Sequence, residues 1–384
     1  MRICLISSSF YPAISYGGPI AATWSLSKEL ARKDVEMYVS TTNANGRSRL
    51  DVDTSSFVKK DENLFVRYYH EQIINKFSID FIFGVWSDIK KGDVIYIQYL
   101  FHYTVFFGLL FSLLHRKKVV LSARGSLSSW GLNYKHRWKK KIWLTCFISP
   151  FIKNIIWQAS SYVEVNDIKS RFKNAYVLVV NDGVDFKSFQ NIKSLSVCEL
   201  VNRFTESQFK VVSEVFFSMG RLHEIKAFDI MIDAFYLFLQ KNPDAKLLIA
   251  GPDDGFRGVL MKKIIEYDLL ESVFLIGSVE HEDKCLLLSN SSAFVLPSHF
   301  ESFGIVVVEA LASGLPVIVS NNTPWRDIEK NKFGIFTPNN KHSLFNAFCK
   351  IKEQEFNSNR LKEFAKLNFD WRILANRFKE IIQE

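Results

Sequence analysis

The sequence predicts an α/β protein with two domains. Its 384 residues, of which 48% are hydrophobic, are enough for two domains of roughly 150 to 200 residues each. Short apolar runs typical of buried strands alternate with helical stretches, and no repeat or low-complexity tract interrupts them. Glycine-containing loops follow several of these strands, at the sheet edge where open α/β proteins bind ligands.

The first predicted strand, Arg2–Ser7, leads into a loop with Gly17 and Gly18 and then into a helix that begins near Pro19. Glycines at this point let a phosphate or a sugar approach the backbone closely. By themselves the two glycines are better explained by an ordinary tight turn.

Positive charge is concentrated in the first half of the chain. Residues 1–190 contain 26 Lys and Arg against 15 Asp and Glu, and residues 94–163 contain ten basic residues and no acidic one. The same stretch is rich in aromatic and aliphatic side chains. A surface of this kind can lie on an anionic membrane leaflet, where cations attract headgroups and rings settle at the interface.

Two other interpretations of this stretch stay open. The apolar run Leu100–Leu114 is too short for a transmembrane helix, which needs about 20 residues, and fits a core helix. The run Ile142–Trp157 is broken by Pro150 and Lys153. Nucleic-acid binding would also use basic residues, but no recognisable nucleic-acid motif accompanies them.

The segment Val179–Phe189, VVNDGVDFKSF, predicts a turn built on Gly183. Further along, the strand before Gly220 is followed by Arg221 in a loop and by Lys226 at the opening of an amphipathic helix. This spacing places two cations at one loop, as a diphosphate leaving group requires. Taken without context, an arginine and a lysine at this spacing are better explained as surface charges.

Two further buried strands are predicted in Ala245–Gly255 and Ser272–Asp283, with Gly277 to Glu280 placed along a nucleotide base. Asp253 and Asp254 fit a solvated turn, and the sequence offers no convincing metal cluster.

The segment LPSHFESFGIVVVEALASGLPVIVS, residues 296–320, is the most informative part of the chain. It predicts a strand over Ala293–Leu296, a loop to Phe303, a helix over Gly304–Ser313 that stops at Gly314, and a strand after Pro316. The amides at the helix N-terminus form an anion site. Glu301 in the loop is expected beside it and Glu309 further along the helix, where both carboxylates suit hydroxyls of ribose and hexose. The arrangement therefore suggests a nucleotide sugar.

ESFGIVVVE, from Glu301 to Glu309, is similar to the E-x7-E signature of the retaining glycosyltransferases with the GT-B fold, in particular family 4. The glycine loop, the NDGVD turn, the G-R-x4-K loop and the two following strands agree with that family in order. Three positions depart from its pattern. Asp182 replaces the usual Asn, Ala227 replaces the usual Gly after the lysine, and Arg124 stands where many relatives have a donor-binding His.

The resemblance implies two Rossmann-like domains that face each other across a cleft. Residues 1–195 would form an acceptor-binding domain, residues 196–368 a domain that binds the nucleotide sugar, and residues 369–384 a helix that crosses back to the first domain. Arg221 and Lys226 would stabilise the leaving diphosphate, Glu301 would hold the donor sugar and Glu309 the ribose. The implied donor-binding residues are Gly17, Gly18, Gly220, Arg221, Lys226, Gly277, Val279, Glu301, Ser302, Phe303, Gly304, Ile305 and Glu309.

The expected reaction moves a hexose from a nucleoside diphosphate to a hydroxyl of a glycan acceptor, with retention and without a metal or other cofactor. The segment SARGSLSSWGLNYKHRWKKK resembles a stretch of members that extend lipid-linked glycans, so we expect a polyprenyl-diphosphate-linked acceptor in bacterial surface polysaccharide synthesis. Residues expected on the acceptor or membrane side are Arg124, Lys139, Lys140 and Lys141.

Two rival functions are a sugar-nucleotide epimerase of the same fold and a non-enzymatic sugar-nucleotide-binding subunit. No nucleic acid is expected as a partner. The five cysteines are scattered without paired spacing, which indicates free thiols in a reducing compartment. The N-terminus lacks a secretory leader. We therefore expect a cytoplasmic protein, peripheral on the inner face of the membrane.

Overall fold

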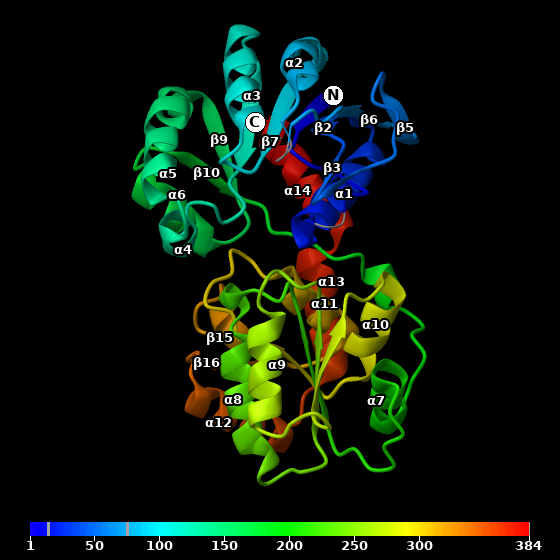
Figure 1. The fold of residues 1–384 in the computed structure, drawn as a ribbon. Helices are drawn as coiled ribbons and strands as arrows, with labels where there is room; N and C mark the ends of the chain where they lie inside the picture. Colours follow the sequence, from blue (N-terminus) through cyan, green and yellow to red (C-terminus); the bar gives the residue numbers. More distant parts are fainter. Residues whose placement is uncertain (14–15, 74–76, 384) are drawn as a thin grey trace. The chain divides into compact units, whose positions relative to one another are not determined.

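The structure, a computed structural model, describes residues 1–13, 16–73 and 77–383. The chain forms two compact units (Figure 1). The first unit comprises Met1–Gly183 together with Trp371–Glu384, and the second comprises Val184–Asp370. Each unit is built on a largely parallel β-sheet packed against helices, which is the α/β class predicted from the sequence.

Within its described residues, the first unit has a sheet with the strand order β10-β9-β8-β7-β1-β2-β6-β5. Its pairs are parallel except β5 with β6. The central strand β7 is buried along its whole length and β8 in all but its first residue, as is typical of parallel sheets covered on both faces. The strands are β1 (Arg2–Ile6), β2 (Glu36–Thr42), β5 (Val58–Asp61), β6 (Leu64–Tyr69), β7 (Val94–Gln98), β8 (Lys118–Ser122), β9 (Ile155–Ala159) and β10 (Tyr176–Val179), and β3 (Ala44–Asn45) pairs with β4 (Ser48–Arg49).

The helices of the first unit include the C-terminal helix of the chain, which returns to this unit from the second. The C-terminal helix α14 packs against α1, and its Phe378 ring lies 4.8 Å from that of Tyr96 on β7. Of the described helices in either unit, none is long and apolar enough to cross a membrane. The helical segments are α1 (Gly18–Ala31), α2 (Ile79–Lys91), α3 (Tyr103–Leu114), α4 (Ser129–Asn133), α5 (Arg137–Trp143), η2 (Leu144–Ile148), η3 (Ser149–Asn154), α6 (Tyr162–Arg171) and α14 (Trp371–Gln383).

The second unit, which is described throughout, has a parallel sheet with the order β13-β12-β11-β14-β15-β16. Its strands are β11 (Val215–Met219), β12 (Lys246–Ala250), β13 (Val273–Gly277), β14 (Ala293–Leu296), β15 (Val317–Ser320) and β16 (Gly334–Thr337). Its helical segments are η4 (Phe186–Phe189), α7 (Val197–Thr205), η5 (Glu224–Lys226), α8 (Phe228–Leu239), α9 (Arg257–Glu266), α10 (His281–Asn290), α11 (Ile305–Ser313), η6 (Arg326–Ile328), α12 (Lys341–Glu353) and α13 (Ser358–Phe369).

Two apolar cores lie on the two faces of this second sheet. Alternate strand residues enter one core or the other, so that Phe217 belongs to the core with α10, α11 and α13, whereas Phe216 belongs to the core with α8, α9 and α12. Burial on both faces explains why the strands read as continuous apolar runs in the sequence. The loops at the carboxyl ends of β11 and β14 therefore extend from strands that are packed on both faces.

The boundary between the units lies earlier than the sequence predicted. The chain leaves the first unit at Gly183, whereas the predicted boundary was Leu195. Val184 and Phe189 already belong to a core of the second unit, and the amide of Leu195 donates to Asn290 Oδ1 at 2.7 Å. The return to the first unit follows Asp370, two residues after the predicted position. The boundary lies directly after Gly183 because the apolar residues that follow it, Val184 and Phe189, pack in the second unit.

Candidate functional site

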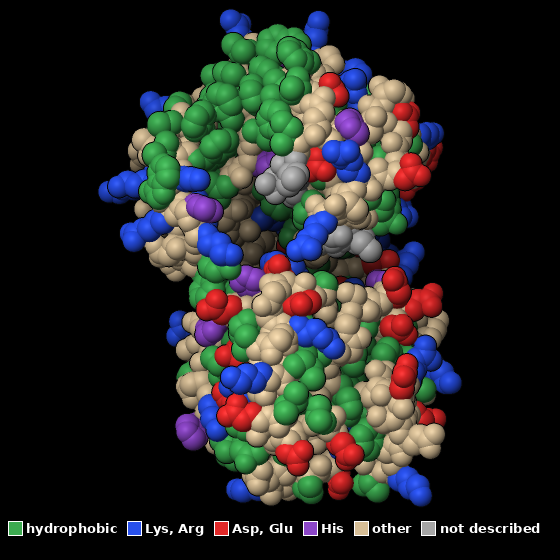
Figure 2. All heavy atoms as spheres, in the orientation of Figure 1, with side chains coloured by type: hydrophobic (Ala, Val, Ile, Leu, Met, Phe, Trp, Pro, Cys, Tyr) green, Lys and Arg blue, Asp and Glu red, His purple; other side chains and the backbone are tan. Residues whose placement is uncertain are grey.

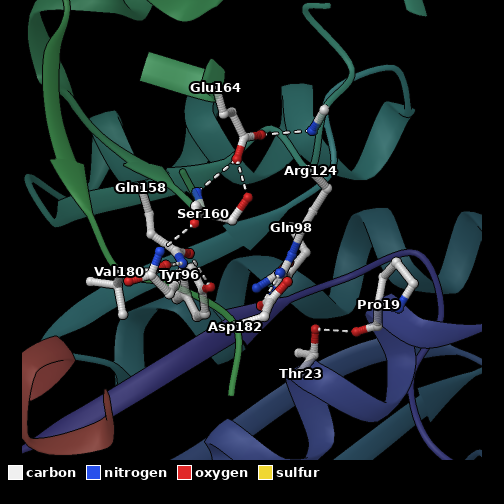
Figure 3. A network of polar contacts seen from close by, with 12 residues as sticks. Pro19, Thr23, Tyr96, Gln98, Arg124, Gln158, Ser160, Glu164, Val180 and Asp182 are labelled. Carbon is white, nitrogen blue, oxygen red and sulfur yellow. Dashed lines mark hydrogen bonds and ion pairs between the residues drawn. The ribbon is translucent and has the colours of Figure 1, made fainter. Parts of the chain in front are cut away.

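Gly17 forms the start of α1 in the first unit. It is the N-cap of the helix and has φ +78°, a left-handed conformation that favours glycine. A Cβ atom placed there would meet no atom within 4 Å, so this part of the backbone is open. The helix begins at Gly18, beside the predicted Pro19, whose carbonyl accepts from Thr23 Oγ1 at 2.7 Å (Figure 3).

In the second unit, the loop after β11 positions Lys226. The residue ends the short helix η5, rather than opening α8 as predicted, because Ala227 adopts a left-handed φ of 51° between the two helices. The Lys226 side chain lies along Gly220, where an added Cβ would come within 3.1 Å of Lys226 Cε. The close packing of lysine on backbone explains why glycine suits position 220.

Glu301 meets Lys226 across the sheet edge. The carboxylate forms an ion pair with Lys226 Nζ, and its Oε1 also accepts from Ser298 Oγ at 2.9 Å. The amide of His299 donates to the carbonyl of Ile225 at 2.8 Å, which joins the two loops directly. Because β11 and β14 are neighbours in the sheet, residues 75 positions apart come together. Their side chains are only 18% and 13% exposed.

The N-terminus of α11 lies beside this pair. Gly304 is its N-cap with φ +82°, and a Cβ there would approach Leu296 Cδ2 to 3.2 Å. No side chain caps the helix, and its first turn contains no acidic residue. The amide of Val307 already donates to the carbonyl of Gly304 at 2.9 Å, so the amides before it, of Ile305 and Val306, are the ones placed to bind an anion. Phe303, however, is buried against the ring of Trp325, and Trp325 Nε1 donates to the carbonyl of Phe303 at 2.6 Å. Phe303 was predicted to bind the sugar nucleotide, and in the structure its side chain has a packing role.

Glu309 lies further along α11 and is paired with a lysine that the sequence analysis missed. Lys284 Nζ on α10 lies 2.5 Å from Glu309 Oε1, and the two side chains are 18% and 12% exposed. Burial lowers the pKa of Lys284, but the charge and hydrogen bond of Glu309 outweigh burial and raise it above the usual value. The only signal in the sequence was a lone cation directly before the apolar run that begins at Cys285.

Arg221 and the residues after β13 lie on the neighbouring strand ends. Arg221 pairs with Asp254, and both side chains are about half exposed, so the arginine is less constrained than Lys226. Asp253 forms the predicted turn, since its Oδ1 accepts three amides ahead of α9. Gly277 ends β13 and accepts from the amide of Gly251 at 2.7 Å, while Val279 packs on the core. Ser302 lies in the loop between Glu301 and Phe303.

Arg124 was predicted on the acceptor or membrane side, but it is a buried residue of the first unit. Its side chain is 6% exposed and forms an ion pair with Asp182 at 2.5 Å (Figure 3). Its Nε donates to Gln98 Oε1 at 2.8 Å. Burial lowers the pKa of Arg124, and the adjacent Asp182 carboxylate raises it by more. Arg124 and Asp182, two of the three residues that depart from the family pattern, therefore form an ion pair with each other.

A wider polar network surrounds Arg124 at the carboxyl ends of β7 to β10. The next residue, Gly125, donates its amide to Glu164 Oε1 at 2.6 Å, and Glu164 Oε2 accepts from the amide and hydroxyl of Ser160, both at 2.7 Å. Tyr96 on β7 donates to Gln158 Oε1 on β9, which links these two strands across β8 (Figure 3). This network fixes the end of the first unit from which the chain leaves at Gly183.

The three consecutive lysines of α5 do not share one environment. Lys139 and Lys141 are exposed, as expected for residues that face a partner. Lys140 points into the protein and donates to the carbonyls of Gly131 and Tyr134, both at 2.6 Å, and burial lowers its pKa. Lys140 is therefore less available to a partner than Lys139 and Lys141, because successive residues on a helix point in different directions.

Residues 202–368 match the model of the family described as glycosyl transferases group 1. Mannosylfructose-phosphate synthase of Agrobacterium fabrum is 24% identical over 224 residues, which cover 55% of this chain and 48% of that protein. The chain spans about half or less of the length of the first sequence relatives that it matches.

Among solved structures, that of Anabaena Alr3699/HepE in complex with UDP has a TM-score of 0.75 at 18% identity, and all of both chains is covered. WaaG, a glycosyltransferase involved in lipopolysaccharide biosynthesis, has a TM-score of 0.68 at 13% identity over 97% of this chain and 95% of its own.

The chain thus has the GT-B fold of glycosyltransferases, as predicted. The match of residues 202–368 to the glycosyl transferases group 1 agrees with the predicted resemblance to glycosyltransferases over the second unit.

Proposed function

We propose that the protein is a retaining glycosyltransferase that moves a hexose from a nucleoside diphosphate to a hydroxyl of a glycan acceptor. The observation that carries the proposal is the contact of Lys226 with Glu301 beside the uncapped N-terminus of α11. The helix amides and Lys226 suit the diphosphate, and Glu301 suits the hydroxyls of the sugar. Similarity to a UDP-bound structure of this fold supports a nucleotide donor.

The paired lysines resolve a difficulty that two carboxylates create near a phosphate site. A free carboxylate would repel the diphosphate, whereas Glu301 and Glu309 each have a lysine partner within one unit. The four side chains together carry no net formal charge. The carboxylates can therefore accept hydrogen bonds from hydroxyls without making the site anionic, and Arg221 adds a positive charge at the neighbouring strand end.

In the proposed reaction, the bond between the anomeric carbon and the diphosphate oxygen breaks, and the acceptor oxygen bonds to the same face. Lys226 and Arg221 stabilise the negative charge that develops on the departing diphosphate, a role that contributes much of the catalysis in such sites. The departing phosphate takes the proton of the acceptor hydroxyl, so a dedicated general base is not required.

The function is tested by measuring release of nucleoside diphosphate from UDP-glucose and from GDP-mannose, with and without a polyprenyl-diphosphate-linked glycan. Release that depends on the glycan supports transfer. Conversion of the nucleotide sugar without any acceptor would identify the epimerase instead. Binding of nucleotide without turnover under either condition would identify a binding subunit.

We also propose that transfer requires no metal ion, because side chains and helix amides meet the charge of the diphosphate. No group of three or more His, Cys, Asp or Glu among the described residues is placed to hold a metal. Acceptor-dependent release should therefore persist after exhaustive treatment with EDTA. Loss of activity with EDTA that returns on addition of Mg²⁺ or Mn²⁺ would contradict this.

The acceptor is proposed to be lipid-linked and to lie on the cytoplasmic face of a membrane during synthesis of a bacterial surface polysaccharide. Hydrophobic side chains gather over α2, α3 and α5 of the first unit (Figure 2). Phe83, Leu114, Trp138 and Ile142 are 77%, 59%, 64% and 50% exposed. The exposed Lys139 and Lys141 lie on the same short helix as Trp138 and Ile142. Apolar anchors with basic neighbours suit an anionic leaflet.

Vesicle sedimentation tests the membrane contact. Each lysine near an anionic surface contributes about 1 kcal/mol, so Lys139→Gln with Lys141→Gln should reduce binding to phosphatidylglycerol vesicles by about tenfold or more at low salt. The matched control is Lys262→Gln with Lys330→Gln, two exposed lysines of the second unit, which should bind as wild type. Equal binding by both double variants, or no binding by wild type, would refute the peripheral contact.

A further inference from the structure

We propose that Lys284 is a positioning residue that orients the carboxylate of Glu309 toward the ribose of the donor and thereby sets a preference for ribonucleotides. The inference rests on the proposed function, because it concerns the nucleotide end of the same site. It adds a residue that neither the sequence motif nor the two-cation loop contains.

The geometry of the pair is specific to one carboxylate oxygen. Lys284 Nζ lies 2.5 Å from Glu309 Oε1. Within the described part of the chain, no side chain donates to Glu309 Oε2. The lysine thus leaves one oxygen for a further donor. The next residues, Ala310 on α11 and Cys285 on α10, are buried, so both side chains project from helices that are anchored in the core.

Burial makes the orientation of Glu309 depend on Lys284. Glu309 lies between Val308 and Ala310, both fully buried, and its own side chain is 12% exposed. A carboxylate in such surroundings is stabilised by a cation or by several hydrogen-bond donors. Lys284 supplies the cation, and without it the carboxylate would turn toward water. That change would move the acceptor that a ribose hydroxyl requires.

The consequence is a chemical preference that can be measured separately from overall affinity. A ribose offers hydroxyls at C2′ and C3′, and a fixed carboxylate oxygen can accept from them. A site that is built to hydrogen-bond a hydroxyl rejects the analogue without it, because its polar group is then left unpaired. If Lys284 fixes Glu309, the discrimination between a ribonucleotide and its 2′-deoxy form depends on Lys284.

The experiment measures calorimetric affinity of the full chain for UDP and 2′-deoxy-UDP, and for GDP and 2′-deoxy-GDP. In wild type, the ribose form should bind about tenfold or more tightly than the 2′-deoxy form, because it makes one more hydrogen bond to a charged group. Lys284→Met should reduce that preference to about twofold or less, as should Glu309→Gln. The double variant should show no further loss, because the two residues act as one unit.

Lys263→Met provides a matched control for removing a half-buried lysine. Lys263 Nζ lies 2.6 Å from Asp233 Oδ1 in the same unit, with side chains 23% and 20% exposed. This variant loses a similar pair away from the site and should keep the ribose preference of wild type. Lys284→Arg retains the charge and should retain most of the preference for the ribose form. If Lys284→Met folds poorly, this variant still tests whether a cation at position 284 maintains that preference.

Three outcomes decide the proposal. An unchanged ribose preference in Lys284→Met, with wild type binding normally, would refute the role of Lys284 and leave the proposed function standing. An equal loss of affinity for the ribose and deoxyribose forms would assign Lys284 a general electrostatic role and also overturn the proposal. Absence of binding to either nucleotide by wild type would instead refute the proposed function itself.

Discussion

Lys226→Ala should lower acceptor-dependent turnover by about a hundredfold or more while the chain stays folded, as expected for loss of a group that stabilises charge in the transition state. Lys226 is the residue most tightly held at the proposed diphosphate position, between Gly220 and Glu301. Turnover of a saturating nucleotide sugar provides the measurement. A loss confined to KM would indicate ground-state binding instead.

The alanine variant also leaves Glu301 without its cation, so a second variant is needed to separate the two effects. Lys226→Ala with Glu301→Gln removes the unpaired negative charge. If the loss arose only because Glu301 repels the diphosphate, the double variant would recover affinity for the free nucleoside diphosphate, which lacks the sugar that Glu301 is proposed to hold. We expect no recovery, because the charge that stabilises the leaving group is still missing. Lys263→Ala, at the paired lysine away from the site, should retain wild-type turnover.

Arg124→Met should destabilise the first unit by about 3–5 kcal/mol, the range found when one partner of a buried ion pair is removed. The variant leaves the carboxylate of Asp182, 15% exposed, without its cation, and Gln98 Oε1 without its donor. Urea titration followed by hydrogen exchange at β7 and β8 reports on the first unit separately from the second.

The companion variant Arg124→Met with Asp182→Asn tests whether the pair acts as a unit. It removes the uncompensated charge, so it should be more stable than Arg124→Met alone, by about 1 kcal/mol or more. A destabilisation below about 1 kcal/mol in Arg124→Met would mean that water already screens Asp182. Additive losses in the double variant would show that the two departures from the family pattern are independent.

Much of the second unit could be predicted from the sequence because its signals are local. The strand β14 has the predicted bounds, Ala293–Leu296. Helix α11 ends at Ser313 before a left-handed Gly314, and β15 begins directly after Pro316. Each of these features depends on side-chain periodicity or on a glycine or proline within a few residues. The same local order made the resemblance to a known family recognisable.

The environment of individual charged residues could not be predicted in this way. Lys139, Lys140 and Lys141 are equivalent in the sequence, yet in the described part of the chain Lys140 alone of the three donates to two carbonyls, one in α4 and one at the C-cap of that helix. Arg124 looked like part of a basic surface and instead lies in a buried network. Burial depends on which loop and strand pack around a residue, and composition alone does not contain that information.

The sequence by itself determined the fold class, the order of elements and the spacing of Glu301 and Glu309, because short-range geometry sets all three. The tertiary structure alone decided the partners of those glutamates. Lys226 reaches Glu301 because β11 and β14 are adjacent in a sheet whose order does not follow the chain, and Lys284 reaches Glu309 because α10 packs beside α11. Ion pairs between distant residues depend on such packing, which results from the burial of two whole cores rather than from any local segment.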